Sequence, residues 1–367
     1  MATTIQKPSA SSSSTTTTTT TFPASVFRAL TPAAYLHAHL THSPPIRPST
    51  RAPSDFRPPV LNTNSLSHSA GSAVVRTGDT AVVVGVRPEI VGVKDIPGHA
   101  EILKASQESA GEAQDDRVEK LGLVVPNVEL ATGCAGSQIP GTAPTRAAQR
   151  LAWRVREGLV GGGVVDVEDL EIMWDRPVIG DEESSEEEEE DGAMEMEEEN
   201  KKVKTRGEVV GYFVLYVDIL VISLAGTPFD SIWAATLAAL RTTVLPKAVY
   251  DPELEMVVCS PLKEEARRLN VKGMPIACTF RVFEPSRFKG LKDEKKTWLL
   301  ADPDEMEEEL CSEEISAVVD CSNAKLGTQI RKLEKTGGWV MGAEEMEQVI
   351  ESSEKRWAEW NGLLEEL

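Results

Sequence analysis

A long apolar run from Val209 to Gly226 limits the possible folds more than any other part of this sequence. Its length approaches the ~20 residues that a helix needs to cross a bilayer. However, Asp218 lies at its middle, where a charged side chain is costly in lipid, and Gly226 begins a turn. The stretch from Tyr212 to Ser223 is rich in Val, Ile, Tyr and Phe, as buried strands are. We therefore predict a buried strand here, and no membrane span.

The charge of the chain is concentrated in one tract. The 367 residues include 38 Lys and Arg against 59 Asp and Glu, which gives a net charge of −21. Residues 181 to 200 hold 13 of these acids and no Lys or Arg. Such a block is typical of a disordered loop. A strongly basic protein that wraps nucleic acid is not expected, but a small basic patch on an acidic body stays possible.

The cysteines exclude two common ways of stabilising a fold. The chain has five, Cys134, Cys259, Cys278, Cys311 and Cys321, with no C-x-x-C pair and no histidine at ligand spacing. This odd set argues against a disulfide framework and against a zinc site, and it fits a reducing compartment. We expect no metal and no cofactor.

Composition divides the chain into a tail and two units. Residues 1–25 include 15 Ser or Thr and predict a disordered tail. Residues 26–250 predict a first unit, interrupted by an acidic insertion at 181–206, and residues 265–367 predict a second. Strands and helices are grouped rather than strictly alternating, which favours an α+β class with two α/β subdomains.

The clearest local pattern is a β-hairpin of residues 72–76 and 80–86 around Gly78. A helix from 144 to 159 has Thr145 as its cap, an apolar face and a second face with four arginines. A helix over 228–245 is expected to be capped by Asp230 or Ser231. In the second unit, the pattern predicts three strands, at 276–283, 298–301 and 315–320. It also predicts a final helix at 343–364.

Several blocks, in one order along the chain, resemble the RNase PH family. The first is the hairpin region 66–86, with a "GSA…(K/R)xGxT…V" pattern; others lie at 125–130, 169–172, 215–218, 229–246 and 299–303. The resemblance covers most of residues 26–360. Within the family, the chain looks most like a ring subunit of the eukaryotic RNA exosome.

This resemblance implies an RNase PH-like fold in a six-membered ring around an RNA channel. The implied partners are other RNase PH-like ring subunits, RNA-binding cap subunits and associated hydrolytic nucleases, with RNA contacted weakly through the channel. Residence in the nucleus, nucleolus and cytoplasm follows from the same resemblance, as does a role in 3′-to-5′ RNA processing and degradation, including rRNA maturation.

The positions that correspond to the family's catalytic carboxylates are degenerate here. Active subunits carry an Asp, a second Asp and a Gly-Glu-Ala-Asp box; this chain has Asp302, Glu308 and Glu314 and lacks the box. The longer Glu side chain displaces the oxygens, which active sites seldom tolerate. We expect no catalytic residue, and we expect Asp302 to end a strand and Glu305 to Glu309 to form a solvated loop.

The RNA-contact candidates are Arg146, Arg150 and Arg154, on the polar face of the 144–159 helix. At most Arg146 corresponds to the family's arginine-rich phosphate loop. The leading hypothesis is therefore a non-catalytic structural subunit. One alternative is an active phosphate-dependent exoribonuclease that uses Asp302, Glu314 and Arg146. Another is an independent RNA-binding assembly factor whose acidic tract holds basic partners.

Overall fold

The computed structural model describes residues 23–108, 114–136, 138–139, 145–177, 205–291, 296–323 and 325–365. The predicted Ser/Thr-rich tail and acidic insertion lie almost entirely outside these residues. Among the helices in the described part of the chain, none is long and apolar enough to cross a membrane.

The predicted apolar strand is β6, the longest strand of a six-stranded sheet. One edge of β6 pairs antiparallel with β3. The other edge pairs antiparallel with β5 near its start and parallel with β4 near its end. The predicted hairpin is confirmed, because β2 and β3 pair through a turn in which Gly78 has φ of 59°. The strands are β1 (Pro59–Thr63), β2 (Gly71–Thr77), β3 (Thr80–Gly92), β4 (Val124–Leu130), β5 (Glu171–Pro177) and β6 (Thr205–Ser223).

The later part of the chain forms a second, four-stranded sheet. Its strands lie in the order β12-β11-β13-β14 and are antiparallel throughout. The pattern predicts three of its strands. The fourth, β14, is polar and mostly solvent-facing, so it carries little apolar signal. The strands are β11 (Ile276–Phe283), β12 (Trp298–Ala301), β13 (Glu313–Asp320) and β14 (Gln329–Thr336).

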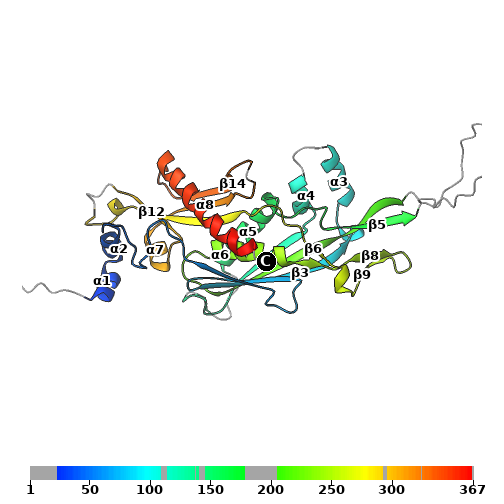
Figure 1. Ribbon diagram of the computed structural model, residues 1–367, viewed down its shortest axis with the longest axis horizontal. Coiled ribbons are helices and arrows are strands. Elements are labelled where there is room, and N and C mark those ends of the chain that lie inside the picture. Colours follow the sequence, from blue (N-terminus) through cyan, green and yellow to red (C-terminus); the bar gives the residue numbers. More distant parts are fainter. Residues whose placement is uncertain are drawn as a thin grey trace, which may run out of the picture.

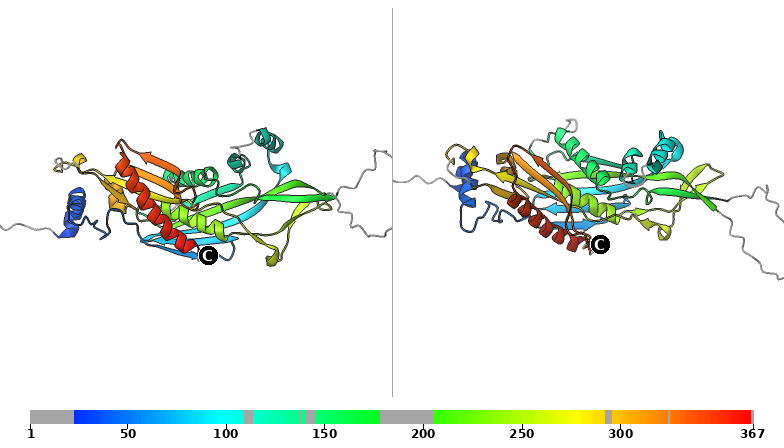
Figure 2. Two further views of the ribbon diagram at one scale, coloured as in Figure 1. Left: turned by 45° about the horizontal axis from the view of Figure 1, so that its top comes forward. Right: turned by 90° about the horizontal axis from the view of Figure 1, so that it is seen from above.

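Helix α6 (Phe229–Thr242) joins the two sheets into one core, as Figure 1 shows. It contacts β2 and β3 on one side and β11 on the other, and most of its side chains are buried. Gly71 of β2 makes this approach possible: a Cβ there would lie 2.5 Å from the carbonyl oxygen of Ala239. Helix α5 (Arg146–Gly161) packs on β4, and α8 (Ala343–Glu365) covers β11 and β13 (Figure 2).

The N-terminal residues pack with the second sheet rather than with the first. Leu36 and Leu40 of α2 are buried in a small core with Phe283 and Leu300. This arrangement differs from the expected first unit, which began at residue 26. The same core includes α7 (Glu305–Leu310), where a solvated loop was expected; the expectation was wrong because Asp304 caps this helix.

The remaining elements lie around these two sheets. The helices are α1 (Ala24–Leu30), α2 (Pro32–Leu40), α3 (His99–Glu108) and α4 (Gln114–Lys120), with 3-10 turns at Val93–Asp95, Lys263–Glu265 and Pro285–Arg287. The short strands are β7 (Val244–Leu245), β8 (Ala248–Asp251), β9 (Met256–Cys259) and β10 (Arg267–Arg268).

Candidate functional site

Asp302, the first of the three family carboxylates, is clamped by Arg57. It directly follows β12 and is 5% exposed. Arg57 Nη2 donates to Asp302 Oδ1 at 2.6 Å, while Arg57 Nε and the Arg57 backbone N–H both donate to Oδ2 at 2.8 Å. Arg51 adds a longer contact of 3.4 Å. Both oxygens of Asp302 are therefore occupied by donors of the chain itself.

The charge state of Asp302 follows from this clamp. Burial alone would raise its pKa, but the hydrogen bonds and charge of Arg57 outweigh burial and hold the pKa of Asp302 below its ordinary value. Its backbone has φ of 46°, in the left-handed region that Asp tolerates better than most residues. Asp302 is thus a structural anchor that is ionised at neutral pH.

The anchor holds the proline-rich segment that precedes β1. Arg47 of this segment is fully buried and lies 3.1 Å from Glu307 Oε2 of α7. Burial raises the pKa of Glu307, and the charge of Arg47 opposes that rise. The segment is thus fixed by ion pairs at two points, to Glu307 of α7 and to Asp302 at the end of β12.

Glu308 and Glu314 share one arginine. Glu314 of β13 lies directly across from Arg281 of β11, with Arg281 Nη2 at 2.8 Å from Glu314 Oε2. The same nitrogen lies 3.5 Å from Glu308 Oε1, which also accepts a hydrogen bond from Thr227 Oγ1. Burial raises the pKa of Glu308, although Thr227 and Arg281 oppose this. The structure therefore brings Glu308 and Glu314 together, but around a cation of the chain.

Arg154 belongs to this network, which corrects its assignment as an RNA contact. Its side chain is buried, 3.5 Å from Glu314 Oε1 and 3.0 Å from Glu334 Oε2. Its guanidinium lies 3.9 Å above the ring of Phe229. Arg154 is therefore not accessible to an RNA phosphate, because it is buried and two carboxylates of the same chain balance its charge.

The other two RNA-contact candidates on α5, Arg146 and Arg150, remain accessible. Arg146 begins the helix, which Thr145 caps as predicted by accepting a hydrogen bond from Ala148 N, and both Arg146 and Arg150 are exposed. Trp153, one turn beyond Arg150, is 59% exposed. Sequence reasoning missed it; its signal was an aromatic residue at helical spacing from an arginine. These three side chains offer a cation and aromatic surface.

A further buried acid, Asp230, lies in the first turn of α6. It caps no helix, contrary to expectation: both of its oxygens accept hydrogen bonds at 2.7 Å from Thr279, one from the backbone N–H and one from Oγ1. Burial raises the pKa of Asp230 to about 7, although the hydrogen bonds of Thr279 oppose this. Asp230 thus fixes α6 to β11.

The arrangement leaves little room for metal or phosphate chemistry at these positions. Within the described ranges, His, Cys, Asp and Glu side chains form no group of three suited to a metal ion. The cations nearest Glu308 and Glu314 are already paired, so an incoming anion would have to displace a carboxylate. These ion pairs can hold segments of the chain together. Among the described residues, Arg146 and Arg150 of α5 are exposed and make no ion pair.

Comparisons with known proteins relate most of the chain to components of the exosome. No model of a known protein family matches the sequence. The chain is 29% identical over 318 residues to the exosome complex component rrp43 of Schizosaccharomyces pombe, covering 87% of this chain and 89% of that protein. It is 27% identical over 229 residues to the exosome complex component Rrp42 of Thermococcus onnurineus, covering 62% of each.

A solved structure supports the fold directly. A chain of the Archaeoglobus fulgidus exosome, determined with RNA bound to the active site, superimposes with a TM-score of 0.56 at 19% identity. The match covers 90% of this chain and 96% of the other. The predicted RNase PH-like α+β fold is confirmed. The chain thus shares the fold of these exosome chains and is similar in sequence to exosome components over most of its length.

Proposed function

We propose that this chain is a structural subunit of an exosome core ring and does not itself cleave RNA. The observation that carries the proposal is that Asp302, Glu308 and Glu314 are all neutralised by arginines of the same chain. The relatives that are exosome components support the ring assignment, since the match to one of them covers nearly the whole chain.

The physical argument rests on the cost of releasing these carboxylates. Removing one partner of a buried ion pair costs about 3–5 kcal/mol, because the remaining charge stays uncompensated. Catalysis at Asp302 would require the loss of Arg57, which also donates to the carbonyl oxygen of Ala225 at 2.7 Å. A phosphorolytic site would therefore have to dismantle contacts that hold the N-terminal segment.

In this proposal the chain completes the ring and lines its channel, together with other RNase PH-like subunits, RNA-binding cap subunits and hydrolytic nucleases. Its own RNA contacts are weak and are made by Arg146, Arg150 and Trp153, through phosphates and base stacking. The process served is 3′-to-5′ RNA processing and degradation, including rRNA maturation, in the nucleus, nucleolus and cytoplasm.

Affinity purification of the C-terminally tagged protein from its own cells, at high salt, tests the assembly. Mass spectrometry is expected to find five other RNase PH-like chains and cap proteins in stoichiometric amounts. Recovery of the chain alone, or as a homo-oligomer, would contradict the proposal and favour an independent RNA-binding factor.

A further inference from the structure

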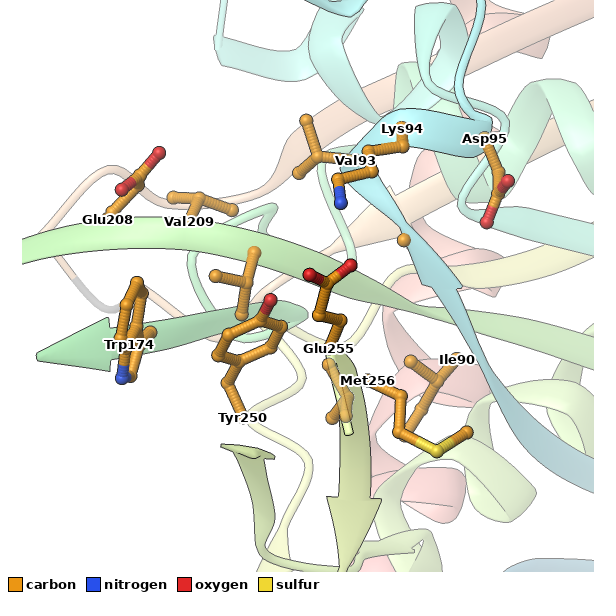
Figure 3. Close-up of a pocket in the computed structure, with 13 residues that line it drawn as sticks. Ile90, Val93, Lys94, Asp95, Trp174, Glu208, Val209, Tyr250, Glu255 and Met256 are labelled. Atoms are coloured by element: carbon orange, nitrogen blue, oxygen red, sulfur yellow. The ribbon is translucent and has the colours of Figure 1, made fainter. Parts of the chain in front are cut away.

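A hollow of about 540 Å³ opens far from the carboxylates, at the other end of the first sheet. Figure 3 shows its walls: the end of β3 with the turn that follows, strands β5 and β6, and the β8–β9 hairpin. Ile90, Val209, Met256 and Val257 supply apolar lining. An alkyl chain that entered the hollow would therefore find apolar contacts.

Two aromatic rings line the same hollow. Trp174 of β5 and Tyr250 of β8 have ring centroids 5.0 Å apart and planes inclined by 51°. The face of such a ring attracts cations, as that of Tyr250 can here. In Figure 3 the Tyr250 ring lies between Trp174 and Glu255. The two rings and the carboxylate of Glu255 thus line the same hollow.

Negative charge exceeds positive charge around the opening. Asp95, Glu208 and Glu255 line it, against the single cation Lys94. Among the described residues none of these three acids makes an ion pair, in contrast to the carboxylates of the first site. Glu255 has φ of 50°, a conformation that costs free energy in a residue other than glycine. The turn thus holds an unpaired carboxylate at the opening of the hollow.

RNA or an anionic lipid surface would be repelled by the charge of Asp95, Glu208 and Glu255. A cationic partner would be attracted, and one with a flat, partly apolar side chain would suit the lining.

We propose that this hollow binds an arginine side chain from a basic segment of a partner protein. The guanidinium stacks on Tyr250 and pairs with Glu255, while its methylene groups contact Ile90 and Met256. Arginine fits better than lysine because its planar group both stacks and forms two parallel hydrogen bonds. This inference goes beyond the ring proposal and does not depend on it.

Fluorescence anisotropy with a labelled peptide of repeated Arg-Gly-Gly units tests the inference on the full-length protein. Glu255→Gln is expected to weaken binding roughly threefold to tenfold, and Tyr250→Ala by about tenfold. Glu255 is exposed, so the Gln variant keeps the fold, which its circular dichroism melt checks. A peptide with Gln in place of Arg should bind neither wild type nor variant.

The matched control is Glu253→Gln, on the same turn but outside the lining, which should leave binding within about twofold. Equal binding by wild type, Glu255→Gln and Tyr250→Ala would overturn the proposal and assign the peptide to the acidic tract. Competition by unlabelled oligouridylate that depends on Tyr250 would overturn it too, in favour of RNA.

Discussion

Replacing Asp302 by Asn separates a structural role from a catalytic one. Asn keeps the size of the side chain and tolerates the left-handed backbone at this position. It offers one carbonyl oxygen, so it cannot satisfy the Arg57 guanidinium and the Arg57 backbone N–H in the same way. The substitution therefore removes the charge of the pair with little steric change.

The expected loss follows from burial. The side chains of Asp302 and Arg57 are 7% and 12% exposed, so solvent screens their interaction little. Leaving Arg57 without its anion should lower the free energy of unfolding by about 3 kcal/mol, the lower end of the usual range, because Arg57 keeps its bond to Ala225. Since the pKa of Asp302 is lowered by folding, this contribution is present at neutral pH and disappears as pH falls below about 4.

Urea unfolding at pH 7 and at a series of lower pH values measures the effect. The control is Glu351→Gln, which removes one partner of an exposed pair with Lys355 and should leave the midpoint unchanged. If Asp302→Asn unfolds at the wild-type midpoint at pH 7, the clamp does not stabilise the protein. Asp302 would then be free for chemistry, and the argument against catalysis would lose its basis.

Three further predictions concern other parts of the molecule. The raised pKa of Asp230, about 7, means that stability falls as pH rises from about 4 to 7, by up to about 1.4 kcal/mol per pH unit; Asp230→Asn should remove this slope in urea titrations. Gly71→Ala should lower the free energy of unfolding by about 1–3 kcal/mol in thermal melts, because its Cβ meets the Ala239 carbonyl. Arg150→Gln should reduce the salt dependence of RNA binding by the assembled ring, by about one ion, whereas Arg154→Gln should instead lower thermal stability.

The parts of the fold that could be predicted depend on local patterns. β6 is read from a continuous apolar run, and the β2–β3 hairpin from alternating apolar residues around Gly78. Both signals lie within a few residues of sequence. β14 lacked such a signal, because an exposed edge strand needs few apolar residues.

Arg154 shows where periodicity misleads. A spacing of four residues advances about 40° beyond a full turn, so Arg154 has rotated about 80° from Arg146 around the helix. This rotation brings it toward the buried side of Leu151 and Val155, over Phe229. The sequence shows that position 154 carries a positive charge. It does not show that carboxylates of β13 and β14 pair with Arg154 in the interior.

The clamps at the candidate site could not be predicted from sequence. Arg57 and Asp302 are 245 residues apart, and no pattern relates them. The hollow at the other end likewise combines side chains from separate strands and turns. Such sites require the tertiary arrangement of the sheets, which short-range propensity does not determine.

Phosphate-dependent RNA degradation by the purified assembly tests the central claim most directly. The assembly is compared with one in which this chain carries both Glu308→Gln and Glu314→Gln, with and without inorganic phosphate. We predict identical behaviour of the two, with no release of nucleoside diphosphates that depends on this chain. Phosphate-dependent release of nucleoside diphosphates that is lost in the variant assembly would contradict the account and establish the chain as an exoribonuclease.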